Sequence, residues 1–245
     1  MSDLKISQML DMQNRLYELH RHEWRPRTAL TANYQLLWSV DELGEVIAII
    51  KKKQSLAVME NEAVRAHFVE EMDDVFMYLF DALQCFGVDE HEFTRAYIEK
   101  YELSGLTSSR SASFLSSKWT HSAEEEKDLS LGEMIELRKK QRESLGLSNE
   151  PDHADSPFRL FSVVEALGAA GGFLKSRGGA EAVCKNINDR ADFLEIIVDV
   201  FLAMFDVALS LGITAQELSY QYEKKFAYNM GRDWHKQNDR LYEDK

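Results

Sequence analysis

Residues 72–83 read MDDVFMYLFDAL, and a similar stretch, IVDVFLAMFDVA, returns at residues 197–208, 125 positions later. Neighbouring segments align at the same offset or at 124 positions: 85–101 with 210–226, and 43–51 with 167–175. Chance similarity between amphipathic helices is the alternative explanation. We predict a degenerate tandem repeat of helical hairpins that forms a pseudo-symmetric bundle with a cleft between or beside its halves.

The composition of the 245-residue chain favours an all-α fold. Only three prolines interrupt it, and 44% of its residues are apolar, enough for a core of its own. Apolar spacing predicts helices at about 4–19, 29–53, 62–86, 89–103 and 130–144. We divide the chain into a first repeat (1–104), a Ser-rich loop with a charged connecting helix (105–156) and a second repeat (157–245). We expect the connecting helix to be largely solvated.

The charge and the cysteines restrict the possible partners and compartment. A net charge of −13 opposes binding to a nucleic acid polymer or an anionic membrane, so a phosphate ligand requires a mediating cation. Cys85 and Cys184 lie apart within apolar segments, which argues against a disulfide framework or a zinc site. We expect no signal peptide and no spanning helix, because no uninterrupted apolar run reaches ~18 residues. A reducing cytoplasm is the expected compartment.

Two pairs of acidic residues stand three positions apart on neighbouring predicted helices. Glu42 and Glu45 share one helix face, and Glu71 and Asp74 share another. If the helices pack antiparallel, four carboxylates converge into a site for a hard cation, Mg²⁺ or Mn²⁺. The alternative is a solvated acidic face. We expect the intervening acids, Glu70 and Asp73, to be surface charges.

This pattern, ExxE, a spacer of 25 residues and ExxD, resembles the all-α nucleoside triphosphate pyrophosphohydrolases, which include MazG-like proteins and dimeric dUTPases. The segments MLDMQNRL (9–16) and YEKKFAYNMGR (222–232) also resemble motifs of dimeric dUTPases. The resemblance implies a homodimer, a nucleobase contact for Gln13, and functional roles for Tyr222, Lys225, Asn229 and Arg232. The spacing of these last four residues predicts that they share one helix face. Two features depart from the family: Tyr17 replaces an Asn, and IIKKK (49–53) replaces a Trp-rich segment.

The two repeats have complementary polar residues, which suggests one composite site. Aligned with the second repeat, Glu42, Glu45 and Glu71 fall on Ala166, Ala169 and Ile196, and only Asp74 keeps an acidic counterpart, Asp199. Conversely, Lys225, Asn229 and Arg232 fall on Lys100, Ser104 and Thr107. The first repeat would then supply metal ligands, and the second would supply phosphate contacts. Alternatively, Lys225 and Arg232 only offset the acidic surface.

The resulting hypothesis is a Mg²⁺-dependent hydrolase that splits a nucleoside triphosphate, dUTP first, into monophosphate and pyrophosphate. Glu45 would accept a proton from the attacking water, and Lys225 and Arg232 would neutralise the phosphates. Asn229 would orient the phosphate chain, and Trp38 would either stack on the base or belong to the core. The first alternative is a MazG-like house-cleaning enzyme with another or broader nucleotide preference. The second is a noncatalytic dimerisation module whose Gly-Ala-rich stretch LGAAGG (167–172) allows close helix approach.

Overall fold

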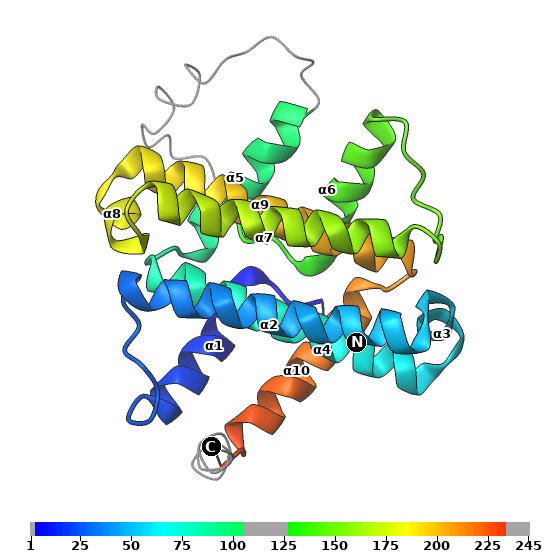
Figure 1. Ribbon diagram of the computed structural model, residues 1–245, viewed down its shortest axis with the longest axis horizontal. Helices are drawn as coiled ribbons and strands as arrows, with labels where there is room; N and C mark the ends of the chain where they lie inside the picture. Colours follow the sequence, from blue (N-terminus) through cyan, green and yellow to red (C-terminus); the bar gives the residue numbers. More distant parts are fainter. Residues whose placement is uncertain (1–2, 105–126, 234–245) are drawn as a thin grey trace.

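The computed structural model describes residues 3–104 and 127–233, and all the named elements of this part of the chain are α-helices (Figure 1). The prediction of an all-α bundle is therefore confirmed. The helices are α1 (Ile6–His20), α2 (Ala29–Lys53), α3 (Ser55–Glu60), α4 (Glu62–Cys85), α5 (Glu90–Ser104), α6 (Leu131–Ser144), α7 (Ser156–Ser176), α8 (Ala180–Lys185), α9 (Ile187–Ser210) and α10 (Ala215–Met230). The short helices α3 and α8 were not predicted from the spacing of apolar residues. The Ser-rich segment at 105–126 lies outside the described residues.

The same start and stop signals delimit equivalent helices in both halves. Asn61 and Asn186 cap α4 and α9, and each side-chain oxygen accepts hydrogen bonds from the second and third backbone amides of its helix. After these helices, Gly87 and Gly212 adopt φ values of 67° and 64°, a left-handed conformation that costs glycine little. The equivalent residues at these four positions explain why α4 and α9 have the same length, 24 residues.

Helix bounds and burial agree with the offsets seen in the sequence. The bounds of α3 and α4 recur in α8 and α9 125 positions later. In α2 and α7 the offset is 124, since buried Ala32, Leu36 and Leu43 correspond to buried Ser156, Leu160 and Leu167. Descent of the two halves from one duplicated unit remains a prediction.

The helices form two groups, and each group contains helices from both repeats. In one group, α10 packs on α1 and α4, and α2 also packs on α4; in the other, α5 packs on α6 and α9, and α7 also packs on α9. Figure 1 shows the two groups as layers, with α2 and α7 crossing the same face. The last helix of each repeat has therefore been exchanged onto the other group.

Aromatic side chains join the two groups at the centre. Phe76 and Phe80 of α4 pack against Phe201 and Phe205 of α9, with three of the ring-centroid distances between 5.2 and 5.7 Å. All four side chains are buried. The stretch that repeats most clearly in the sequence thus forms the contact between the repeats.

The segments before α1 and α6 also pair with each other. The amide of Ile6 donates to the carbonyl of Leu129 at 3.0 Å, and the amide of Leu131 donates to the carbonyl of Leu4 at 2.9 Å. These two bonds lie at equivalent positions of the repeats. They bring α6 into the structure next to α1.

The prediction that the charged helix α6 is largely solvated is wrong. Its apolar residues Leu131, Met134 and Ile135 are buried against α5, α9 and α10. Two of its basic residues point inward as well: Arg138 and Arg142 both bind the buried carboxylate of Asp206 in α9. The high charge of this helix therefore serves internal ion pairs in addition to solvent contact.

We expect the helix exchange to depend on Arg65 of α4. Its guanidinium bridges to Glu217 of α10 and donates to the carbonyls of Leu211 and Gly212 at 3.0 and 2.7 Å. The Arg65→Ala substitution removes these partly buried, charge-assisted bonds and should lower the free energy of unfolding in urea by roughly 2 kcal/mol.

Arg21→Ala is the control for this prediction, because Arg21 forms an exposed pair with Glu18 within α1. Its expected loss is below about 0.5 kcal/mol. Equal small losses in the two variants would contradict a role for Arg65 in holding the exchanged helix.

Candidate metal and phosphate site

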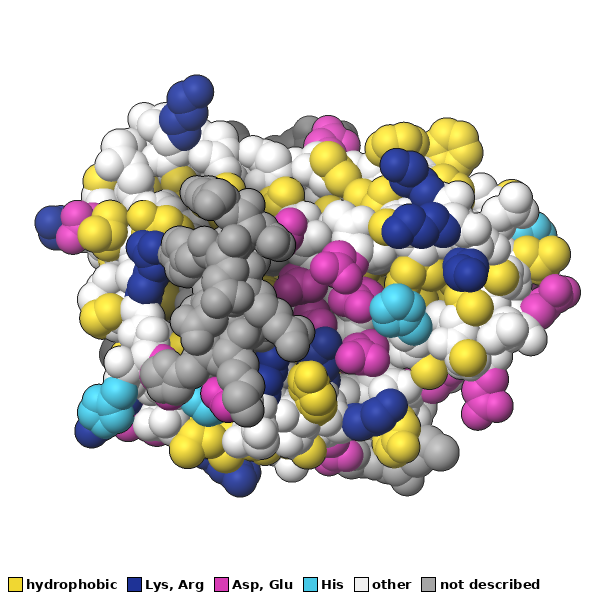
Figure 2. Space-filling view, turned by 60° about the horizontal axis from the view of Figure 1, so that its bottom comes forward, with side chains coloured by type: hydrophobic (Ala, Val, Ile, Leu, Met, Phe, Trp, Pro, Cys, Tyr) yellow, Lys and Arg dark blue, Asp and Glu magenta, His cyan; other side chains and the backbone are white. Residues whose placement is uncertain are grey.

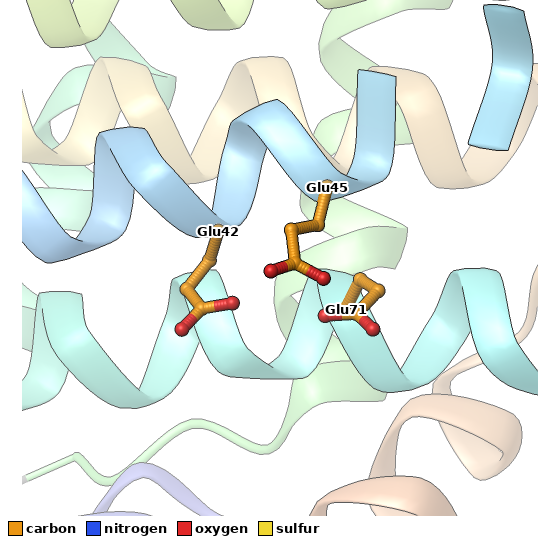
Figure 3. A group of neighbouring side chains, drawn as sticks. All are labelled: Glu42, Glu45 and Glu71. Atoms are coloured by element: carbon orange, nitrogen blue, oxygen red, sulfur yellow. The ribbon is translucent and has the colours of Figure 1, made fainter. Parts of the chain in front are cut away.

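Three carboxylates from two helices converge at one place on the surface. Glu42 and Glu45 extend from α2 toward Glu71 of α4, and each residue offers an oxygen within 4.8 Å of the others (Figure 3). Glu42 is half-buried, Glu45 is exposed and Glu71 is buried. Figure 2 shows acidic side chains gathered near the middle of one face, with Lys and Arg side chains on either side. The structure thus brings together three of the four predicted metal ligands.

Two acids of this cluster, Glu42 and Glu71, have raised pKa values. Burial raises the pKa of Glu42 to about 7, and the neighbouring carboxylates of Asp74, Glu45 and Glu71 add to the shift. Burial and the charge of Glu45 also raise the pKa of Glu71. The positive charge of Lys225 acts in the opposite direction in both cases. The protein alone therefore compensates the negative charge only in part, and an added cation would favour the ionised acids.

The fourth predicted ligand, Asp74, faces a lysine. Lys225 Nζ lies 2.5 Å from Asp74 Oδ2 and 3.1 Å from Glu70 Oε1. Burial raises the pKa of Asp74 to about 6 even though Lys225 lowers it. This ion pair joins α4 to the exchanged helix α10, and it puts a basic group beside the carboxylate cluster.

The prediction that Glu70 and Asp73 are surface charges is wrong for Asp73, whereas Glu70 keeps a partly exposed side chain. Glu70 pairs with Lys225 in a partly buried position. Asp73 is wholly buried, and its two carboxylate oxygens have no hydrogen-bond partner among the described residues. Burial raises the pKa of Asp73 well above its usual value, because a buried charge without hydrogen bonds is unfavourable.

The residues of the late motif lie in different environments. Tyr222 is buried, and Asn229 is buried with its amide nitrogen 3.9 Å from Met77 Sδ. The Asn229 Oδ1 atom has no partner among residues 3–104 and 127–233. The prediction that Arg232 lies on the same helix face is wrong, because α10 ends at Met230. The guanidinium of Arg232 lies 5.8 Å from the ring centre of Tyr228.

The two residues expected to contact the base differ in accessibility. Gln13 is only 1% exposed, and its amide nitrogen donates to the hydroxyl of Tyr222 at 2.9 Å. Trp38 is 47% exposed and stacks on Tyr78 at a centroid distance of 6.0 Å. Trp38 is therefore open to a planar ligand in this arrangement, whereas Gln13 is not.

Two residues near the cluster were missed in the sequence analysis. His67 Nε2 lies 2.9 Å from Glu71 Oε1, one helical turn away, and this spacing is visible in the sequence. Tyr78 lies one turn beyond Asp74, and burial together with the charges of Glu42 and Asp74 raises its pKa. Both residues line the same side of α4 as the carboxylates.

The site combines two kinds of chemical group. Three hard oxygen donors are suited to a divalent cation, and the lysine beside them is suited to an anion such as phosphate. Comparison of the chain with models of known protein families, with curated proteins and with solved structures finds no match.

The raised pKa of Glu42 predicts a pH-dependent stability without divalent ions. The pKa of this carboxyl rises from 4.5 to about 7 on folding. The folded protein therefore loses stability as the pH rises from 4.5 to about 7, because the unfolded chain releases the proton more readily than the folded one. Glu42→Gln should therefore raise the free energy of unfolding by about 1 kcal/mol at pH 8, with solvent screening taken into account, and hardly at pH 4.

Denaturant unfolding at both pH values tests this prediction, with Glu60→Gln as a control at an exposed acid of α3. In saturating Mg²⁺ the order should reverse, since the wild type then gains stability from binding. A difference between wild type and Glu42→Gln that is independent of pH, or matched by the control, would contradict the electrostatic account.

Proposed function

We propose that this protein is a Mg²⁺-dependent nucleoside triphosphate pyrophosphohydrolase, with dUTP as the first substrate to test. The observation that supports it most strongly is the approach of Glu42, Glu45 and Glu71 within 4.8 Å, next to the lysine of a helix from the other repeat. The sequence resemblance to dimeric dUTPases and MazG-like proteins supports the substrate class.

A magnesium ion fits the residues present at the site. Glu42, Glu45 and Glu71 would hold it, because carboxylate oxygens are its preferred protein ligands. Burial and neighbouring carboxylates raise the pKa values of Glu42 and Glu71, and a bound cation would offset both effects. When bound, such an ion polarises phosphate oxygens and acidifies water. Manganese accepts the same donors.

Side chains of the protein would carry out the remaining steps of the reaction. Glu45 is the exposed member of the cluster, so its carboxylate is the one best placed to accept a proton from an attacking water. The ammonium of Lys225 stays charged, because Asp74 and Glu70 raise its pKa, and it can neutralise phosphate oxygens. Attack on the α-phosphorus forms a new P–O bond to the water oxygen and breaks the bond to the bridging oxygen, which leaves with pyrophosphate.

A base can be accommodated at Trp38, which stacks on Tyr78 and keeps an exposed surface. Stacking of this kind discriminates poorly between bases. Since the amide of Gln13 is buried and bonded to Tyr222, a second candidate function is a house-cleaning enzyme with a broader nucleotide preference.

The reaction products test the proposed chemistry. With dUTP and Mg²⁺, anion-exchange chromatography should show dUMP and pyrophosphate in equal amounts, because the proposed attack is at the α-phosphorus. The same assay with the other nucleoside triphosphates measures base preference. Release of orthophosphate and a nucleoside diphosphate would exclude the proposed reaction.

Lys225 and its counterpart Lys100 provide a matched pair of variants. Each lysine pairs with an aspartate of the long central helix of the other repeat, Asp74 or Asp199, but only Lys225 lies beside the carboxylate cluster. Lys225→Met should lower kcat/KM by roughly 10²-fold or more, the scale for loss of a charge-stabilising donor. Lys100→Met should change it less than about threefold.

Circular dichroism and Mg²⁺-induced thermal stabilisation of both variants separate lost catalysis from lost folding. Comparable activity losses in two folded variants would contradict the assignment of the phosphate contact to Lys225 alone.

A further inference from the structure

A histidine lies beside the carboxylate cluster, and the proposed reaction does not use it. His67 Nε2 lies 2.9 Å from Glu71 Oε1, and the two residues are one helical turn apart on α4. An ionised carboxylate has only acceptor atoms, so the Nε2–H group of His67 donates in this bond when Glu71 is ionised. His67 therefore contacts one of the three candidate metal ligands directly.

The two partners of this bond have different surroundings. The side chain of Glu71 is 9% exposed, whereas the side chain of His67 is 58% exposed. Within residues 3–104 and 127–233, His67 is the only hydrogen-bond partner of the Glu71 carboxylate. The bond thus fixes the orientation of a buried carboxylate, while the histidine itself contributes little to the core.

His67 is not itself a member of the carboxylate cluster. One oxygen from each of Glu42, Glu45 and Glu71 lies within 4.8 Å of the other two (Figure 3). No nitrogen of His67 belongs to this set. With Oε1 of Glu71 bonded to His67, Oε2 keeps its lone pairs for an ion. This geometry suits a residue that acts on a metal through Glu71.

The second repeat lacks both the cluster and the histidine. The positions 125 residues after His67 and Glu71 hold Asp192 and Ile196 of α9. The asparagine caps at the starts of α4 and α9, by contrast, are the same in both repeats. The bond between His67 and Glu71 therefore belongs to the half of the molecule that contains the candidate metal ligands, and not to the framework that both halves share.

We infer that His67 is a positioning residue for the metal: its bond to Glu71 holds that carboxylate in the orientation that binds Mg²⁺ or Mn²⁺. The inference rests on the proposed function, because it requires the metal site. Hydrogen bonds to a ligating carboxylate orient it toward the ion, and loss of such a partner weakens metal binding roughly 10- to 100-fold. His67 acts in this way without contacting the ion.

Manganese binding to the full chain, followed by the electron paramagnetic resonance signal of free Mn²⁺, tests the inference without a nucleotide or a catalytic step. His67→Ala should raise the Mn²⁺ dissociation constant by roughly 10-fold or more, because the Glu71 carboxylate loses its hydrogen-bond partner. His67→Gln should stay within about threefold of the wild type, since a glutamine amide can donate to the same carboxylate oxygen.

His91→Ala is the matched control, because His91 also lies near a glutamate, Glu90, but on α5 and outside the cluster. It should leave the Mn²⁺ affinity unchanged. Thermal unfolding without divalent ions separates positioning from folding. Since His67 is largely exposed, His67→Ala should change the Tm by less than about 2 °C under these conditions.

The outcomes separate the inference from the proposed function. Equal Mn²⁺ affinity in the wild type and His67→Ala would overturn the inference and leave the metal site intact. A hyperfine coupling between bound Mn²⁺ and an imidazole nitrogen that disappears in His67→Ala would also overturn it, because His67 would then be a direct ligand. A wild type that binds no Mn²⁺ would contradict the metal site itself, and with it the proposed function.

Discussion

The packing of α4 against α9 through Phe76, Phe80, Phe201 and Phe205 is the contact on which the rest of the structure depends. These buried rings bring equivalent stretches of the two repeats together at the centre. With the two long helices in contact, the last helix of each repeat can reach the long helix of the other. The exchanged positions of α5 and α10 follow from this central contact, as does the combination of groups from both repeats in one site.

Because α10 packs on α4 of the other repeat, it provides a basic partner for the acidic segment of α4 at residues 70–74. Four acids crowd into five positions of α4, and they are accommodated in three different ways. Glu70 and Asp74 share Lys225, Glu71 joins the carboxylates of α2, and Asp73 is buried with a raised pKa. Without a residue from the other repeat, two of these acids would lack compensation. The site is therefore a property of both repeats together.

The ion pairs of this arrangement have equivalents in which the second repeat supplies the aspartate and the arginine. Lys100 of α5 pairs with Asp199 of α9, as Lys225 of α10 pairs with Asp74 of α4. The bridge from Arg190 to Glu92 likewise repeats the bridge from Arg65 to Glu217. Ion pairs that hold exchanged helices thus occur in both groups. The clustered glutamates occur only in the first group among the described residues. This difference separates residues that stabilise the fold from those that are candidates for function.

The sequence by itself determined the long helices, the repeat offsets and three members of the carboxylate cluster. These features depend on local spacing: helical periodicity places Glu42 beside Glu45, and the cap Asn61 and the glycine Gly87 delimit α4. Periodicity also gave the correct helix for α6 but the wrong environment, because it does not reveal that Arg138 and Arg142 meet the buried carboxylate of Asp206.

Only the tertiary structure decided which helix supplies each partner and which side chains are open to solvent. The side chain of Gln13 is buried and hydrogen-bonded to Tyr222, which lies more than 200 positions away in the chain. Asp73 is buried although other acidic residues lie close to it in the sequence. The end of α10 at Met230 removes Arg232 from the predicted helix face. Such outcomes depend on contacts between segments far apart in the chain, and their energies come from packing and desolvation, which local residue spacing does not encode.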